Sequence, residues 1–225
     1  MITGLNPRAE VALDGFALDP SCVLYLPLWK LDGDSFMSKD AYGHLCTNHG
    51  ALWTPRGRRF DGEDDYVDCG SDTSLDLTDE ITIEAWMKIK DFTDAGYLLA
   101  RNLASPIDSM QYGIYVEKTE IVYIIVEQST WDTEKAVTIG KRTHLVALIK
   151  SGSYQKLYLN GVYQGKTTCP TIVSRDWKLL IGMRNDNGGQ KFPFNGLIAI
   201  IRIYNRALTP QEILDHYIIG KEMFG

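Results

Sequence analysis

Several aromatic, carboxylate and amide side chains of this 225-residue chain are of the types that bind sugars. Flat aromatic faces stack on sugar rings, and planar polar groups beside them exchange hydrogen bonds with hydroxyl groups. Two predicted loops carry such groups, and further aromatic side chains lie in predicted strands. The predicted ligand-binding residues are Trp131, Asp132, Asn185, Asp186, Asn187, Tyr112 and Trp86. The alternative for the second loop is that Asn-Asp-Asn-Gly-Gly is a flexible turn without a ligand.

Residues that could act as catalysts form no recognisable catalytic motif. The four histidines are scattered, and neither a Gly-x-Ser-x-Gly nucleophile elbow nor a glycine-rich phosphate loop occurs. The run from Glu63 to Asp68 is acidic, but a retaining glycosidase needs two carboxylates about 5–5.5 Å apart, and nothing in the sequence sets that separation. Spacing alone leaves a Ser-His-Asp or Cys-His site open. We predict no catalytic residues and no enzyme activity.

The elements that must position the sugar-binding groups are almost all strands. Residues 81–89 alternate between apolar and polar types, which predicts a half-buried strand with Glu84 and Trp86 on its other, solvent-facing side. Asn160-Gly161 predicts a type I′ hairpin turn, and residues 197–204 predict a strand buried on both faces. About a dozen strands at spacings of roughly 8–12 residues indicate an all-β, two-sheet antiparallel jelly-roll sandwich.

The end of the chain predicts one short C-terminal helix. Thr209, Pro210 and Glu212 supply an N-cap, a proline at the first helical position and a capping box, and an apolar stripe follows them. We expect this helix to cover one end of the sandwich. Since no linker divides the strands, the predicted organisation is an N-terminal arm, residues 1–20, and one jelly-roll domain, residues 21–225.

Composition limits the partners and the compartment. A net charge of −6 argues against nucleic acid, and no apolar run is long enough for membrane insertion. Cys22, Cys46, Cys69 and Cys169 form no C-x-x-C pair, so disulfides and free thiols both stay open. The first 20 residues have no secretory signal pattern, which predicts synthesis in a cytoplasm. Secretion is the alternative if this N-terminus is not the native one.

Four segments, taken in order, resemble the laminin-G-like, concanavalin A-like lectin/glucanase superfamily over residues 22–218. The resemblance implies a jelly-roll sandwich of two curved sheets. It leaves function open, because the superfamily includes lectins, carbohydrate-binding modules, adhesion domains and viral structural proteins. The segments are Val23–Leu28; Asp40-Ala41-Tyr42-Gly43 with Asn48-His49-Gly50; Phe60–Val67 with Ile81–Trp86; and Leu157–Gly161, Ile181-Gly182 and Phe194–Gly196 through to Leu208.

The same resemblance implies a candidate calcium site and an absent catalytic motif. Its calcium ligands here would be Asp40, Asp61, Asp64 and Asp65, and calcium is the one cofactor considered. Relatives commonly place two acids in the last strand where this chain has Ala199-Ile200, which weakens the calcium prediction. The alternative is that the aspartates form ordinary turns. The glucanase pattern Glu-x-Asp-x-x-Glu is only approached, in the acidic turn rather than in the catalytic strand.

Two functions are expected on these grounds. The first is a non-catalytic structural protein of a large assembly, a virion decoration or fibre component. It would be displayed on the assembly surface, tethered to other structural proteins through residues 1–20, with an adhesion role in binding carbohydrate. The second is a stand-alone carbohydrate-binding, lectin-like module; a glycoside hydrolase ranks below both. A glycan ligand and a homo-oligomer are compatible with either.

Overall fold

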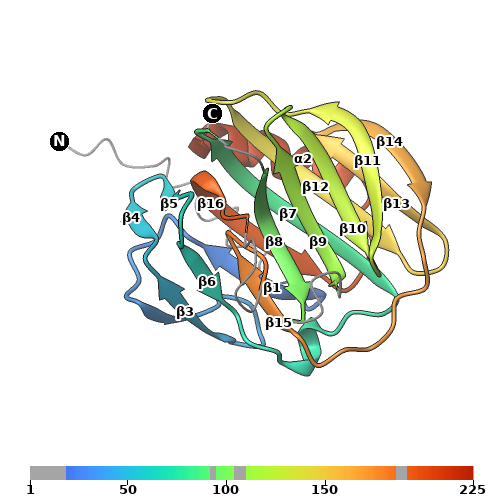
Figure 1. The fold of residues 1–225 in the computed structure, drawn as a ribbon, viewed down its shortest axis with the longest axis horizontal. Helices are drawn as coiled ribbons and strands as arrows, with labels where there is room; N and C mark the ends of the chain where they lie inside the picture. Colours follow the sequence, from blue (N-terminus) through green and yellow to red (C-terminus); the bar gives the residue numbers. More distant parts are fainter. Residues whose placement is uncertain (1–18, 92–94, 104–109, 186–191, 225) are drawn as a thin grey trace.

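The computed structural model describes residues 19–91, 95–103, 110–185 and 192–224. Within them, two antiparallel sheets stack face to face, and helix α2 (Pro210–Phe224) packs on one sheet (Figure 1). This confirms the predicted all-β sandwich with a C-terminal helix. The division into an arm of residues 1–20 and a domain of residues 21–225 stays a prediction, because residues 1–18 lie outside the described part.

The two sheets are named here by their strands, in spatial order. Sheet A contains β14 (Val162–Thr168), β13 (Tyr154–Leu159), β12 (Arg142–Lys150), β7 (Glu80–Ile89), β16 (Asn195–Tyr204), β5 (Gly57–Asp61) and β4 (Leu52–Thr54), with β1 (Cys22–Pro27) also paired to β16. Sheet B contains β11 (Ser129–Ala136), β10 (Ile121–Val126), β9 (Met110–Glu117), β8 (Ala95–Asn102), β15 (Lys178–Ile181), β6 (Tyr66–Asp68), β3 (Leu45–His49) and β2 (Ser35–Met37). A short 3-10 helix spans Thr73–Leu75.

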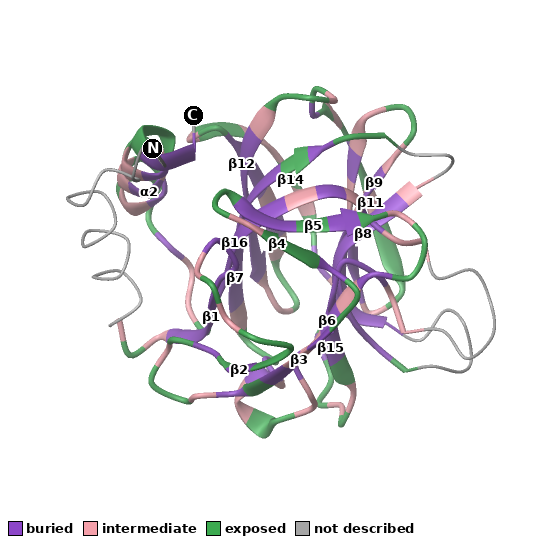
Figure 2. Cartoon of the chain, turned by 90° about the vertical axis from the view of Figure 1, so that its left-hand side faces the viewer, coloured by how far each residue is buried: buried purple, intermediate pink, exposed green. Residues whose placement is uncertain are grey.

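The main core lies between the sheets, where apolar side chains from alternate strand positions meet. Figure 2 shows buried residues along the strands and exposed residues mainly in the turns. The hairpin at Asn160-Gly161 has the expected positive φ angles, 52° and 75°, which confirms the local turn prediction. The segment of Trp131 and Asp132, which was expected as a loop, is part of strand β11 instead.

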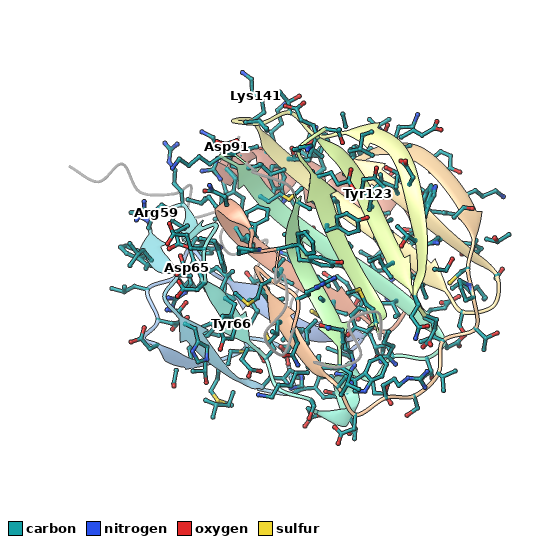
Figure 3. The ribbon with its side chains drawn as sticks, viewed as in Figure 1. Arg59, Asp65, Tyr66, Asp91, Tyr123 and Lys141 are labelled. Atoms are coloured by element: carbon teal, nitrogen blue, oxygen red, sulfur yellow. The ribbon has the colours of Figure 1, made fainter. Side chains whose placement is uncertain are left out.

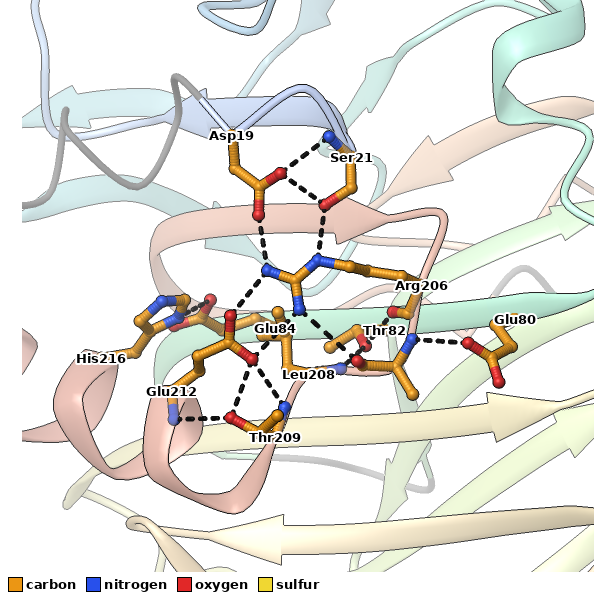
Figure 4. A network of polar contacts seen from close by, with 11 residues as sticks. Asp19, Ser21, Glu80, Thr82, Glu84, Arg206, Leu208, Thr209, Glu212 and His216 are labelled. Atoms are coloured by element: carbon orange, nitrogen blue, oxygen red, sulfur yellow. Dashed lines mark hydrogen bonds and ion pairs between the residues drawn. The ribbon is translucent and has the colours of Figure 1, made fainter.

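Helix α2 begins with the predicted capping box. The Thr209 amide donates to Glu212 Oε2 at 2.7 Å, and the Glu212 amide donates to Thr209 Oγ1 at 3.2 Å. Arg206 joins this helix start to the beginning of the described chain, donating to Glu212 Oε1 at 2.7 Å and to Asp19 Oδ2 at 2.6 Å (Figure 4). Charge-assisted bonds of this kind are short and directional, so they fix where α2 leaves the sheet. No helix among the described residues is apolar and long enough to cross a membrane.

Helix α2 covers the outer face of sheet A rather than an end of the sandwich. A second apolar cluster, distinct from the main core, joins the helix residues Ile213 and Phe224 to outward-facing strand residues such as Trp86 and Ile200. The expectation that Glu84 and Trp86 face solvent is therefore wrong, since Glu84 is 0% and Trp86 2% exposed. An alternating pattern identifies two faces of a strand, but it does not show that a distant helix buries the polar one.

Glu84 is the centre of a buried charged network between β7, β12, β16 and α2. Its carboxylate lies 2.8 Å from His144 Nε2, 2.9 Å from His216 Nδ1 and 3.3 Å from a terminal nitrogen of Arg202. Burial by itself raises the pKa of Glu84, but the charges of His216 and Arg202 and the bond to His144 hold that pKa well below its ordinary value. Burial lowers the pKa of His144. The network thus keeps an ionised carboxylate beside a neutral His144.

We expect stability to fall as the pH is lowered from about 7 to about 5. The native state resists protonation of His144, whereas the unfolded chain binds that proton near the ordinary histidine pKa of about 6.5. The unfolded state therefore holds more protons in this range, which lowers the free energy of unfolding. Urea denaturation at a series of pH values measures the slope of the free energy of unfolding against pH. His144→Gln should flatten it, while His49→Gln, at an exposed ring stacked on Tyr66, should leave it unchanged; equal slopes in all three proteins would contradict the assignment.

Candidate functional site

Three tyrosines form a platform on the outer face of sheet B. Tyr97 on β8 lies directly opposite Tyr115 on β9, which lies opposite Tyr123 on β10. Directly opposed residues project to the same side of a sheet. The ring centroids are 5.1 Å apart for Tyr97 and Tyr115, and 4.7 Å apart for Tyr115 and Tyr123, whose planes differ by 8°. We call these three residues the tyrosine platform; Figure 3 labels Tyr123 on its strand.

Strand alternation fixes which side the platform faces. Ile114 and Val116, the neighbours of Tyr115, are fully buried in the main core, so Tyr115 must point to the outer face. Tyr115 and Tyr123 are half-buried, and Tyr97 is buried against its neighbours. The platform therefore offers two partly exposed rings, with a third, buried ring beside them.

Polar groups flank the platform on both sides. Asp132 lies opposite Tyr123 on β11 and accepts a hydrogen bond from its hydroxyl at 3.3 Å. At the other end, a hollow of about 220 Å³ lies beside Tyr97 and Tyr115, with Arg184 and Glu117 in its wall. The Arg184 guanidinium lies 4.8 Å from the Phe192 ring centroid, within the range of a cation–π contact. Rings, carboxylates and a guanidinium therefore surround one shallow surface.

The phenol groups of this surface stay protonated over the working pH range. Burial raises the pKa of Tyr115, and the nearby Tyr97 and Glu117 add to that effect. The pKa of Tyr123 is also raised, by desolvation and by the negative charges of Glu117 and Asp132. Neutral hydroxyl groups both donate and accept hydrogen bonds. The platform is thus suited to hydrogen-bond a polar ring through its hydroxyl groups and to contact it through its exposed ring atoms, and it is poorly suited to supply a phenolate nucleophile.

The predicted sugar-binding residues are not gathered in one place. Asp132 lies beside the platform, whereas Trp131 packs partly buried against the main core. The Tyr112 hydroxyl donates to the Leu75 carbonyl oxygen inside the sandwich, so its ring is 0% exposed. Trp86 lies beneath α2. Asn185 is fixed through its main chain to the side chain of Asn102, while Asp186 and Asn187 lie outside the described residues.

The tyrosine platform itself was missed by sequence reasoning. The sequence predicts strands at residues 96–101, 111–117 and 120–127, and each tyrosine can be assigned to a face of its strand. The sequence does not set the register between β8, β9 and β10. That register brings three tyrosines that are far apart in the chain next to one another. Their signal was present only as tyrosines in three consecutive predicted strands, with two of them, Tyr112 and Tyr115, in the middle strand.

Three of the four candidate calcium ligands come together. Carboxylate oxygens of Asp61, Asp64 and Asp65 lie within 4.8 Å of one another. Asp40 lies elsewhere, where its carboxylate accepts amide hydrogens from Tyr25, Tyr42 and Gly43.

The donor set fits calcium only in part. Asp65 Oδ2 already accepts the Asp61 amide at 2.8 Å, and burial, with the charges of Asp61 and Asp64, raises the pKa of Asp65. Three carboxylates fall short of the six to eight oxygens that calcium takes, unless water and main-chain carbonyls complete the shell. Calcium therefore stays a prediction, which a calorimetric titration with CaCl₂ can test.

Comparison with known proteins assigns the family. A family profile described as the concanavalin A-like lectin/glucanases superfamily matches residues 61–214. The chain belongs to this superfamily. Its two antiparallel sheets are thus those of a concanavalin A-like sandwich. No curated protein sequence matches the chain.

Several solved structures of similar fold come from enzymes that act on carbohydrates. A Trypanosoma rangeli sialidase mutant with trans-sialidase activity matches with a TM-score of 0.73 and 15% identity, over 97% of this chain and 38% of the sialidase chain. Domain 4 of AbnA, a GH43 extracellular arabinanase from Geobacillus stearothermophilus solved with arabinotriose, matches with a TM-score of 0.67 and 17% identity. That match covers 88% of this chain and 98% of the domain. The chain thus spans well under half of the sialidase, and at these identities the likeness shows the fold alone.

These comparisons correct one expectation. A role as a virion decoration or fibre component finds no support, because the similar structures are a sialidase and an arabinanase domain rather than parts of a viral assembly. The missing secretory signal pattern does not support that role either, because it depends on where the sequence begins.

Proposed function

We propose that this concanavalin A-like domain binds carbohydrate through the tyrosine platform. The observation that carries the proposal is the row of Tyr97, Tyr115 and Tyr123 across three strands, in which Tyr115 and Tyr123 stack, with Asp132 hydrogen-bonded at one end. Sugar rings pack on clustered aromatic side chains flanked by a few polar groups that fix their orientation. The arabinotriose in the structure of AbnA domain 4 is compatible with this proposal, although the 17% identity supports only a shared fold.

We propose binding without hydrolysis. The carboxylates nearest to the platform, Glu117 and Asp132, both raise the pKa of Tyr123, so this tyrosine is not set up to lose its proton and attack a sugar. A hydrolase would need a general acid beside a nucleophile or an activated water. An assay for newly formed reducing ends, with any oligosaccharide that binds, separates the two functions. Release of reducing ends by the wild-type domain would overturn this part of the proposal.

We expect Tyr115→Ala to weaken oligosaccharide binding at least about tenfold. Tyr115 is the central ring, and loss of an aromatic anchor costs about 2 kcal/mol or more, where about 1.4 kcal/mol corresponds to a factor of ten. A glycan array identifies a bound oligosaccharide, and calorimetry then compares its affinity for both proteins.

The matched control is Tyr163→Ala. Tyr163 is an exposed tyrosine on β14 of sheet A, 48% accessible, and its loss should leave affinity unchanged. Circular dichroism checks that each variant is folded. If the wild-type domain bound no glycan, or if both variants bound equally well, the platform would not be the binding surface.

A further inference from the structure

A second pocket lies where sheet A meets the C-terminal half of α2. It encloses about 330 Å³ between the turn before β12, the β13–β14 hairpin and the helix. In Figure 3, Lys141 marks this end of the molecule, and Tyr123 of the platform belongs to the other sheet. The residues that line the pocket are Trp86, Gly140, Lys141, Arg142, Asn160, Tyr217 and Lys221.

Every charged residue in this lining is a cation. The chain as a whole carries a net charge of −6, whereas this lining holds Lys141, Arg142 and Lys221 and no carboxylate. Lys88, directly opposite Arg142 in the register of β7 and β12, adds a fourth positive charge nearby. Such a concentration of one sign of charge in a concave site attracts ions of the opposite sign.

Arg142 is the most constrained of these cations. It is partly buried, and its guanidinium lies 5.9 Å from the Phe224 ring centroid. Burial lowers the pKa of Arg142, and repulsion from Arg56 adds to this effect. No ion pair joins Arg142 to a carboxylate within the part of the chain that the structure describes. Burying a charge without a partner is costly, and a bound anion would offset that cost.

The neutral residues of the pocket contribute a side-chain amide and a rigid wall. Trp86 Nε1 is buried against α2 beside Gly220, so it is not one of the groups that reach the pocket. Asn160 Oδ1 accepts the His144 amide at 3.0 Å, so the side-chain acceptor of Asn160 is in use. The Tyr217 ring stacks on Trp86 with centroids 5.9 Å apart and planes within 3°, which gives the pocket a rigid apolar wall.

We propose that this pocket binds an oxyanion: the carboxylate, sulfate or phosphate group of a small molecule. Arg142 forms its base, Lys141 and Lys221 its rim, and the Tyr217 ring its wall. The planar donor fork of an arginine matches the oxygens of all three groups. This site uses no residue of the tyrosine platform, so the proposal is independent of the proposed sugar-binding function.

Titration of the whole chain with inorganic phosphate and inorganic sulfate tests the proposal. NMR spectra should show saturable shifts of the Gly140 and Lys141 amides and of one of the five tryptophan indole signals, that of Trp86. NaCl at the same ionic strength should not reproduce them, because ionic strength acts on all exposed charges alike. Sodium acetate and glucuronate, compared with phosphate and sulfate, then separate carboxylate from tetrahedral oxyanions.

Arg142→Gln should raise the dissociation constant at least about fivefold, and Lys166→Gln, at an exposed lysine on β14, should not change it. Should Arg142→Gln fail to fold, Lys141→Gln combined with Lys221→Gln provides the same test, because both lysines are exposed. Shifts that do not saturate, that NaCl reproduces, or that the pocket variants leave intact would each overturn the proposal.

Discussion

Glu84→Gln is expected to lower the free energy of unfolding by about 3–5 kcal/mol, the usual cost of removing one partner from a buried ionic network. Glutamine has nearly the same shape, so the loss would come from charge rather than from a cavity. Arg202, 0% exposed and 3.3 Å from the carboxylate, would lose its negative partner, and one of the two histidines would face an amide nitrogen in place of an acceptor oxygen. Urea denaturation followed by circular dichroism measures the change.

A second glutamate on the same strand provides the matched control. Glu80 pairs with Lys150 at 2.9 Å, but both side chains are partly exposed to solvent, at 27% and 44%. Exposed ion pairs are screened by water and contribute little, so Glu80→Gln should destabilise the protein far less than Glu84→Gln. Similar effects of the two substitutions would mean that the buried network does not hold α2 and sheet A together.

This contrast shows which part of the fold could be predicted from sequence. Asn160-Gly161 and the Thr209 capping box depend on a few adjacent residues, and both have the predicted geometry. The faces of Glu84 and Trp86 depend on a helix about 130 residues later in the chain, as the bond between Glu84 and His216 shows. A polar side chain in an alternating strand is predicted to be exposed unless its distant partner is known.

The candidate site, too, could be predicted only where it depends on residues that are close in the chain. The aspartates at positions 61, 64 and 65 lie close together because they share one turn, and the sequence made that plain. The tyrosine platform depends on the registers of two strand pairs, which sequence alternation does not set. The oxyanion pocket combines a turn, a hairpin and a helix, so its cations are neighbours only in the folded chain.

Gly220→Ala is expected to destabilise the protein, although the same change stabilises most helices. Alanine in a helix interior is ordinarily favoured over glycine by about 1 kcal/mol. Here a Cβ atom at position 220 would lie 2.6 Å from Cζ2 of Trp86 and closer still to its Nε1, so α2 would have to move away from sheet A. Overpacking of this kind costs about 1–3 kcal/mol, and thermal or urea unfolding measures the net sign.

A double-mutant cycle with Trp86→Phe identifies the cause. Phenylalanine lacks the five-membered ring that carries Nε1, so the Cβ atom at position 220 would have more room and Gly220→Ala should cost less in that background. Interaction energies between residues in contact are commonly about 0.5–3 kcal/mol. If Gly220→Ala stabilised the wild-type protein, or had the same cost in both backgrounds, the close contact of α2 with Trp86 could not be what requires glycine at this position.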